Sequence, residues 1–101
     1  MSYIPVTIQR MDRETETWTD WLHLHAIKVN RAGGGEAYRG EREQYQPRLL
    51  FELHWCSALE ALRWDPMSHR IVYQGHTLNI VDYDDFMERH INIRLTGEAY
   101  G

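Results

Sequence analysis

The sequence predicts a mainly β fold: a small closed or partly open β-barrel of about six strands, with a long Gly-rich loop and at most one or two short helices. Short stretches alternate between apolar and polar residues, which is the pattern of half-buried strands. Turn signals separate these stretches. The length of 101 residues fits one domain with one modest core, so residues 1–101 form a single domain. Curling the sheet into a barrel removes exposed sheet edges.

Two strands are predicted in the first third of the chain. In residues 3–10, Ile4, Val6 and Ile8 share one face, and Pro5 favours an edge position because it lacks an N–H. Residues 11–17 are polar and predict a hairpin tip. Residues 18–30, WTDWLHLHAIKVN, carry apolar residues on both faces, which predicts a strand covered on both sides for part of its length.

Residues 31–46, RAGGGEAYRGEREQYQ, predict an exposed loop excursion. Three consecutive glycines have high backbone entropy and no side chain to pack. Loops of this length in a compact domain are usually functional or disordered. Its mixed arginines and glutamates indicate either a solvated face or a segment that docks on a partner through ion pairs.

The second half continues the strand pattern. Residues 47–56, PRLLFELHWC, predict a strand with its apolar residues on one face, and residues 57–63 predict one or two helical turns. RIVY and HTLNIVDY flank Gln74 and Gly75, where glycine supplies the positive φ of a tight hairpin turn. Residues 84–88 predict a polar connection. The last strand, residues 90–95, places Ile91, Ile93 and Leu95 on one side.

Composition limits the possible functions. A net charge of −4 argues against a general nucleic-acid binder, and no apolar run approaches the ~20 residues of a membrane span. The N-terminal residues lack the pattern of a secretory signal. A single cysteine, Cys56, rules out an intrachain disulfide. Ten of the 11 basic residues are arginine, which suits protein interfaces, although a genome-wide arginine bias would look the same.

Two groups of side chains raise the question of metal binding. His23 and His25 share one face of a predicted strand, as zinc ligands would, but no spacing selects a third ligand. Surface or half-buried histidines are the favoured interpretation. The candidates for that third ligand are His54, His76, Asp82 and Asp84.

The second group, Asp82, Asp84 and Asp85, suits a hard cation, yet the calcium-loop pattern is absent and a solvated turn is favoured. Cys56 lacks any nucleophile signature and is expected to be a small buried hydrophobe. No serine-nucleophile or phosphate-loop motif occurs. The sequence therefore predicts no enzyme and no cofactor.

The C-terminal third resembles the signature of the tailed-bacteriophage head–tail joining family, which comprises head-closure, stopper and head–tail adaptor proteins. The family pattern is an arginine, an apolar strand, a polar-Gly turn, an apolar strand ending in Asp, a short polar link and a final alternating strand. The matching positions are Arg70, Ile71, Val72, Tyr73, Gly75, Ile80, Asp82 and residues 91–95. Similar residues in the family's order upstream are Trp21, Val29, Asn30, Gly35, Glu36 and Tyr38. The sequence departs from the family at His54-Trp55, where members often carry Arg-Tyr.

The resemblance implies a structural virion protein at the head–tail interface, assembled in the host cytoplasm and without a membrane. Such a protein self-associates into a sixfold or twelvefold ring, binds the portal or connector ring and the tail proteins, and closes the portal vertex after packaging. Packaged double-stranded DNA would pass or be retained without sequence-specific binding. The expected partner interface is Gly33, Gly34, Gly35, Glu36, Tyr38, Arg39, Arg42 and Tyr100.

Two alternatives remain open from the sequence. A tail-terminator or tail-completion protein would use a similar small β-rich subunit on the tail side of the joint. A small metal-binding β-barrel would use His23 and His25.

Overall fold

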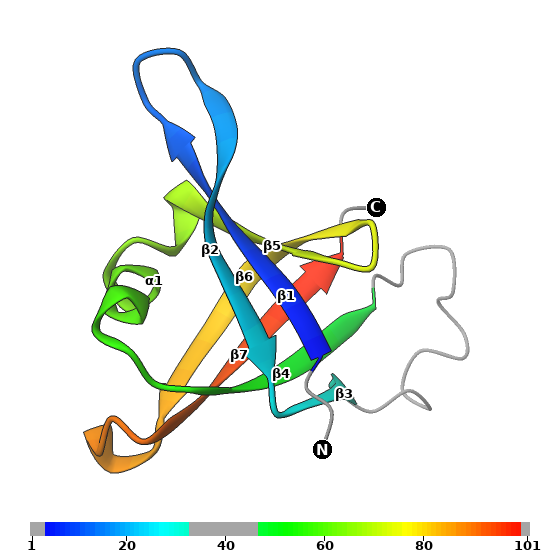
Figure 1. Ribbon diagram of the computed structural model, residues 1–101, viewed down its shortest axis with the longest axis vertical. Coiled ribbons are helices and arrows are strands. Elements are labelled where there is room, and N and C mark those ends of the chain that lie inside the picture. The colour runs from blue at the N-terminus through cyan, green and yellow to red at the C-terminus, as the bar shows by residue number, and fades with distance from the viewer. Residues whose placement is uncertain (1–3, 33–46, 100–101) are drawn as a thin grey trace.

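The computed structural model describes residues 4–32 and 47–99, which form a curled antiparallel sheet with one short helix (Figure 1). The predicted mainly β fold is confirmed. The order of strands in the sheet is β2-β1-β5-β6-β7-β4-β3. The strands are β1 (Ile4–Asp12), β2 (Thr17–Ala26), β3 (Lys28–Ala32), β4 (Arg48–His54), β5 (His69–Tyr73), β6 (His76–Asp85) and β7 (Asn92–Ala99).

The sheet has seven strands rather than about six because one long segment bends. Strands β2 and β3 stand at opposite ends of the strand order, yet only Ile27 separates them in the chain. The Ile27 N–H donates to the carbonyl oxygen of Glu52 at 2.7 Å. The segment therefore pairs first with β1 and then with β4, and the sheet curls into a partly open barrel.

The core lies inside this curl, and the connection between β4 and β5 covers one end of it. That connection contains a 3-10 turn η3 (Ser57–Leu59), helix α1 (Glu60–Trp64) and a 3-10 turn η4 (Pro66–Ser68), so the predicted helical turns are confirmed. Leu59 and Leu62 are fully buried there. The buried apolar residues are Val6, Ile8, Ala26, Phe51, Leu53, Leu59, Leu62, Ile71, Leu78, Ile80, Ile93 and Leu95.

The predicted tight turn between β5 and β6 is also confirmed. Gln74 and Gly75 have φ angles of 50° and 79°. Two successive positive φ values are typical of the hairpin turn whose twist matches its flanking strands.

The prediction that the first strand lies at an edge is wrong, since β1 lies between β2 and β5. Strand β5 is short, however, and pairs only with the part of β1 from Thr7 to Arg10. Pro5 lies in the part of β1 that only β2 reaches, so its missing N–H removes no bond to β5.

Other boundaries differ from the expected ones. Strand β1 runs on to Asp12, which shortens the hairpin tip, and β6 extends to Asp85, into the predicted polar connection. Residues 31 and 32 of the predicted excursion belong to β3, and the rest of the excursion, residues 33–46, lies outside the described residues.

The last strand begins at Asn92, not at residue 90, and its expected alternation fails at Ile91. Ile93 and Leu95 are buried, whereas Ile91 is 63% exposed. The preceding connection turns through positive φ angles at Met87 and His90, so Ile91 is still outside the strand. The physical reason is that alternation holds only within a strand.

Candidate functional site

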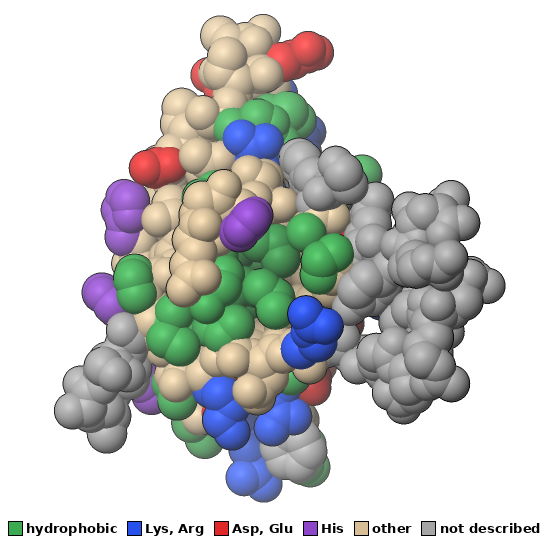
Figure 2. Space-filling model, turned by 90° about the vertical axis from the view of Figure 1, so that its right-hand side faces the viewer, with side chains coloured by type: hydrophobic (Ala, Val, Ile, Leu, Met, Phe, Trp, Pro, Cys, Tyr) green, Lys and Arg blue, Asp and Glu red, His purple; other side chains and the backbone are tan. Residues whose placement is uncertain are grey.

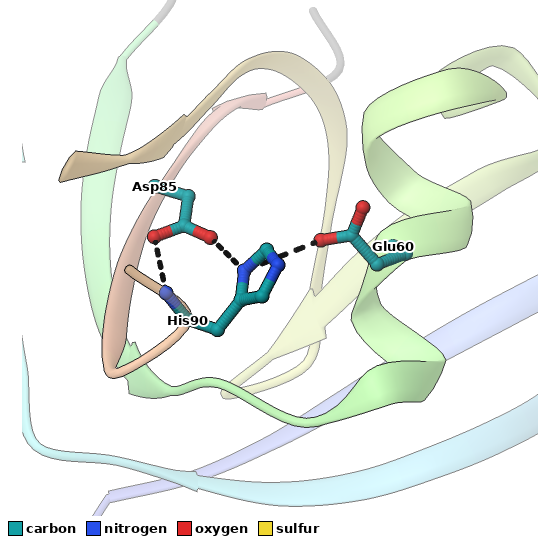
Figure 3. A group of neighbouring side chains, drawn as sticks. All are labelled: Glu60, Asp85 and His90. Atoms are coloured by element: carbon teal, nitrogen blue, oxygen red, sulfur yellow. Dashed lines mark hydrogen bonds and ion pairs between the residues drawn. The ribbon is translucent and has the colours of Figure 1, made fainter. Parts of the chain in front are cut away.

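Three ionisable side chains gather where α1 meets the connection between β6 and β7 (Figure 3). Glu60 is the first residue of α1, Asp85 is the last residue of β6, and His90 precedes β7. One donor atom from each lies within 4.8 Å of the others. We call Glu60, Asp85 and His90 the carboxylate–histidine cluster.

Asp85 and His90 are joined by two contacts. The Nδ1 atom of His90 lies 2.5 Å from Oδ2 of Asp85, and the backbone N–H of His90 donates to Oδ1 at 3.0 Å. The Asp85 side chain is only 2% exposed. Burial alone raises the pKa of Asp85, but the hydrogen bonds from the His90 ring and backbone outweigh it, so this pKa lies below its ordinary value. Asp85 is therefore a buried, ionised carboxylate.

Glu60 is held from the other side by two neutral donors. The indole N–H of Trp55 and the hydroxyl of Tyr83 donate to its Oε2 at 3.0 and 3.3 Å. The Trp55 bond is the largest influence and lowers the pKa of Glu60 below its ordinary value, against the effect of burial. Burial, reinforced by the charge of Glu60, raises the pKa of Tyr83, so this hydroxyl stays protonated and donates. The Oε2 atom of Glu60 lies 4.0 Å from Nδ1 of His90.

The His90 ring has a fixed orientation. It stacks on the Trp55 ring with centroids 4.3 Å apart and planes 17° apart. The backbone N–H of Trp55 donates to the carbonyl oxygen of Ile91 at 2.9 Å, which ties Trp55 to the β6–β7 connection. The cluster and Trp55 together thus join the end of β4, helix α1 and the β6–β7 connection.

That connection adopts an unfavourable backbone conformation. Met87, Glu88 and His90 have φ angles of 52°, 54° and 59°, values that residues with a side chain rarely adopt. Such conformations persist where the surroundings enforce them. Here the contacts of His90 do so, together with an ion pair of 2.9 Å between Arg63 and Glu88.

The expected cluster of Asp82, Asp84 and Asp85 does not form, because β6 runs on to Asp85 and successive strand residues point to opposite faces. A β-bulge between Ile80 and Asp82 decides which face each residue takes. The bulge places Asp85 opposite the buried Ile93, while Asp82 and Asp84 are exposed on the outer face. Asp82 and Asp84 are therefore solvated but lie in strand β6 rather than in a turn, and the solvated-turn interpretation is wrong for Asp85. Sequence reasoning missed Glu60 and His90 as its partners, since neither belongs to a recognisable motif.

The expected histidine pair lies elsewhere, exposed on β2. His23 and His25 oppose Thr7 and Pro5, and Nδ1 of His23 lies 3.3 Å from the Thr7 hydroxyl. Across the described ranges 4–32 and 47–99, the carboxylate–histidine cluster is the one group of three metal-donor side chains. None of the third ligands considered from the sequence, His54, His76, Asp82 and Asp84, joins the pair in such a group.

Cys56 is half-buried rather than fully buried, and its thiol is free. The interface residues expected from the resemblance, namely Gly33, Gly34, Gly35, Glu36, Tyr38, Arg39, Arg42 and Tyr100, all lie outside the described residues.

A second surface feature is an apolar hollow of about 300 Å³ at the barrel end that carries the β5–β6 turn. Apolar side chains gather on this side of the molecule (Figure 2). The hollow lies between the start of β4, the β5–β6 hairpin and the end of β7. Its lining residues are Pro47, Leu49, Tyr73, Gln74, His76, Leu78 and Ala99.

No protein-family model matches the chain, and no curated protein matches it significantly. In residues 4–32 and 47–99, no helix is long and apolar enough to cross a membrane.

Proposed function

We propose that this chain is a structural subunit of the head–tail connector of a tailed bacteriophage, which closes the portal vertex after DNA packaging and provides the platform for the tail. The role is mechanical and not enzymatic. The proposal starts from the resemblance of the C-terminal third to head–tail joining proteins.

The observation that carries the proposal is the match between that signature and the order of elements. The resembling residues form β5, a left-handed Gln74-Gly75 turn, β6, a short link and β7, in that sequence. These three strands are neighbours at the centre of the sheet. Most of the C-terminal residues that carry the resemblance therefore lie in the three central strands of the sheet.

The shape of the N-terminal hairpin supports a role in assembly. Strand β5 reaches β1 only as far as Arg10, so beyond it β1 and β2 pair with each other alone. This end of the hairpin projects past the rest of the sheet (Figure 1). In a ring, such a projecting arm provides a surface for a neighbouring subunit, and the apolar hollow provides another.

The charge also fits a channel through which DNA passes. With a net charge of −4, the subunit neutralises few phosphates, so it holds duplex DNA weakly and without reading its sequence. The proposed partners are the portal or connector ring, the tail proteins and further copies of this chain in a sixfold or twelvefold ring.

The test is deletion of the gene in the phage that encodes this chain, followed by electron microscopy of the particles. Tailless heads that have lost their DNA are the expected result, and expression of the intact chain from a plasmid should restore virions. Normal virions would contradict the proposal. DNA-filled heads beside finished, unattached tails would instead favour the tail-terminator or tail-completion alternative.

The remaining alternative, a metal-binding barrel that uses His23 and His25, has little support from the geometry. Both side chains are exposed, and the described part of the chain supplies no third ligand to them.

A further inference from the structure

We propose that Glu60, Asp85 and His90 bind one divalent cation, with zinc as the best match, and that the metal ties the β6–β7 connection to helix α1. This site goes beyond the connector function and does not depend on it. It is also distinct from the exposed pair of His23 and His25.

The donor set suits zinc. Zinc in proteins accepts imidazole nitrogen and carboxylate oxygen at about 2.0–2.2 Å in a tetrahedral arrangement, which sets neighbouring donors roughly 3.3 Å apart. The two donor separations around Nδ1 of His90 lie on either side of this value, at 2.5 Å to Asp85 and 4.0 Å to Glu60. Since the three donors lie within 4.8 Å of one another, metal binding would draw Glu60 closer to His90 and move Asp85 away from it.

Binding exchanges the metal for a proton. The short contact between His90 and Asp85 contains one proton, carried on Nδ1 of the imidazole. When Nδ1 becomes a metal ligand, that proton leaves to solvent, and the cation takes its place between imidazole and carboxylate. No oxidant or further reactant is involved.

A second layer of contacts already positions each ligand. The backbone N–H of His90 holds the remaining oxygen of Asp85, and Trp55 and Tyr83 donate to the carboxylate of Glu60. Trp55 also stacks on the His90 ring. Such outer contacts orient the ligands of protein metal sites.

The charge and the access to solvent also fit a hydrated cation. Glu60 and Asp85 contribute two negative charges, and the nearby Arg63, 3.8 Å from Glu60, is shared with Glu88 at 2.9 Å. His90 is 42% exposed. This exposure of His90 lets water supply the fourth ligand from the solvent side.

The experiment uses the full chain without a histidine tag, stripped with chelator and titrated with zinc chloride by calorimetry and thermal unfolding. The expected result is one equivalent of zinc and a melting temperature that rises with zinc concentration. Asp85→Asn, His90→Gln and Glu60→Gln should each weaken binding at least tenfold. Asp82→Asn and His25→Gln are the matched controls and should bind as the parent does.

The results that would contradict the zinc site can be told apart from one another. No heat and no zinc-dependent stabilisation in the parent at tenfold excess would overturn the proposal and leave the cluster as a hydrogen-bonded ion pair. Binding that survives His90→Gln but is lost in His25→Gln would place the metal on β2 and also overturn it. If Asp85→Asn does not fold, judged by circular dichroism, zinc binding by Glu60→Gln and His90→Gln decides whether the cluster holds the metal. The connector function is tested by particle morphology, so the two proposals fail independently.

Discussion

Asp85 combines deep burial with full ionisation, because His90 bonds both of its oxygens. Its pKa lies below the ordinary value in the folded protein, so the unfolded chain binds a proton more readily than the native state does. The stabilisation is complete above the ordinary aspartate pKa of about 3.9 and is lost as the pH falls through the lower, folded value. Acid should therefore weaken the tie between β6 and the connection that follows it.

The first prediction concerns this pH dependence in chelator-treated protein. The asparagine in Asp85→Asn cannot ionise, so this variant should have a lower melting temperature than the parent at pH 7. Its melting temperature should then fall less than that of the parent between pH 6 and pH 3. Thermal unfolding by circular dichroism measures both effects. The control is Asp82→Asn, an exposed carboxylate of the same strand, which should follow the parent. A parallel pH profile for Asp85→Asn and the parent would contradict the expectation.

Gly97 in β7 is needed because its neighbours leave no space for a side chain. A Cβ atom there would lie 3.0 Å from Cβ of Leu78 and 3.1 Å from Cδ1 of Ile71. Gly97→Ala should therefore destabilise the fold by about 1–3 kcal/mol, the usual penalty of overpacking. Urea unfolding measures this as a lower midpoint.

The matched control is the glycine of the β5–β6 turn. A Cβ at Gly75 meets nothing within 4 Å, and its φ of +79° is a left-handed value that asparagine tolerates. Gly75→Asn should thus destabilise less than Gly97→Ala. A larger loss of stability in Gly75→Asn than in Gly97→Ala would show that the turn conformation at Gly75 matters more for stability than the close packing at Gly97.

At the scale of the element, the start of β7 gives different burial to two isoleucines, Ile91 and Ile93, that the sequence pattern places on the same side. Ile93 is 1% exposed and Ile91 is 63% exposed. Ile93→Ala should lower the free energy of unfolding by about 2–5 kcal/mol, because it leaves a cavity in the core. Ile91→Ala should change it by less than about 0.5 kcal/mol. Equal losses in urea unfolding would mean that the strand begins earlier than Asn92.

The elements also show which parts of the structure a sequence can reveal. Alternation located β1 and β4, and the glycine turn located the β5–β6 hairpin, because both signals are local. The cluster could not be found this way. The bulge after Ile80 reverses the side to which Tyr83 and Asp85 point, so strict alternation from Leu78 and Ile80 would place Asp85 outside.

Glu60 and His90 were missed for a related reason. They meet only because α1 covers the end of the barrel, and that packing depends on the burial of Leu59 and Leu62. No spacing along the chain records this contact. The bend at Ile27 was likewise hidden, since the apolar residues on both parities of residues 18–30 predicted one continuous strand.

At the scale of the whole molecule, the curl of the sheet depends on β3 and β4 being held next to each other. Ala32 and Arg48 are paired directly, and the ladder continues from there to Lys28 and Glu52. Residues 33–47 join the two ends of this ladder. A shorter connection would satisfy the same pairing, because loop-closure entropy changes slowly with length.

The last prediction concerns residues 33–39, which lie outside the described residues. Deleting residues 33–39 leaves residues 40–47 to join β3 to β4, which is still longer than the roughly 2–5 residues of most hairpin loops and so is long enough to close the pair. The fold should therefore persist, with a circular dichroism spectrum and melting temperature close to those of the parent. Docking on the portal or connector ring, measured by cosedimentation, should be lost, because the resemblance places the partner interface in this segment.

The control keeps the full loop length and replaces only Tyr38 and Arg39 with serine. If side chains make the contact, this variant should lose docking as the deletion does. If it still docks while the deletion variant does not, the length of this segment matters for docking and these two side chains do not. A deletion variant that folds and docks as the parent does would remove residues 33–39 from the interface and leave the projecting β1–β2 hairpin as the surface to test next.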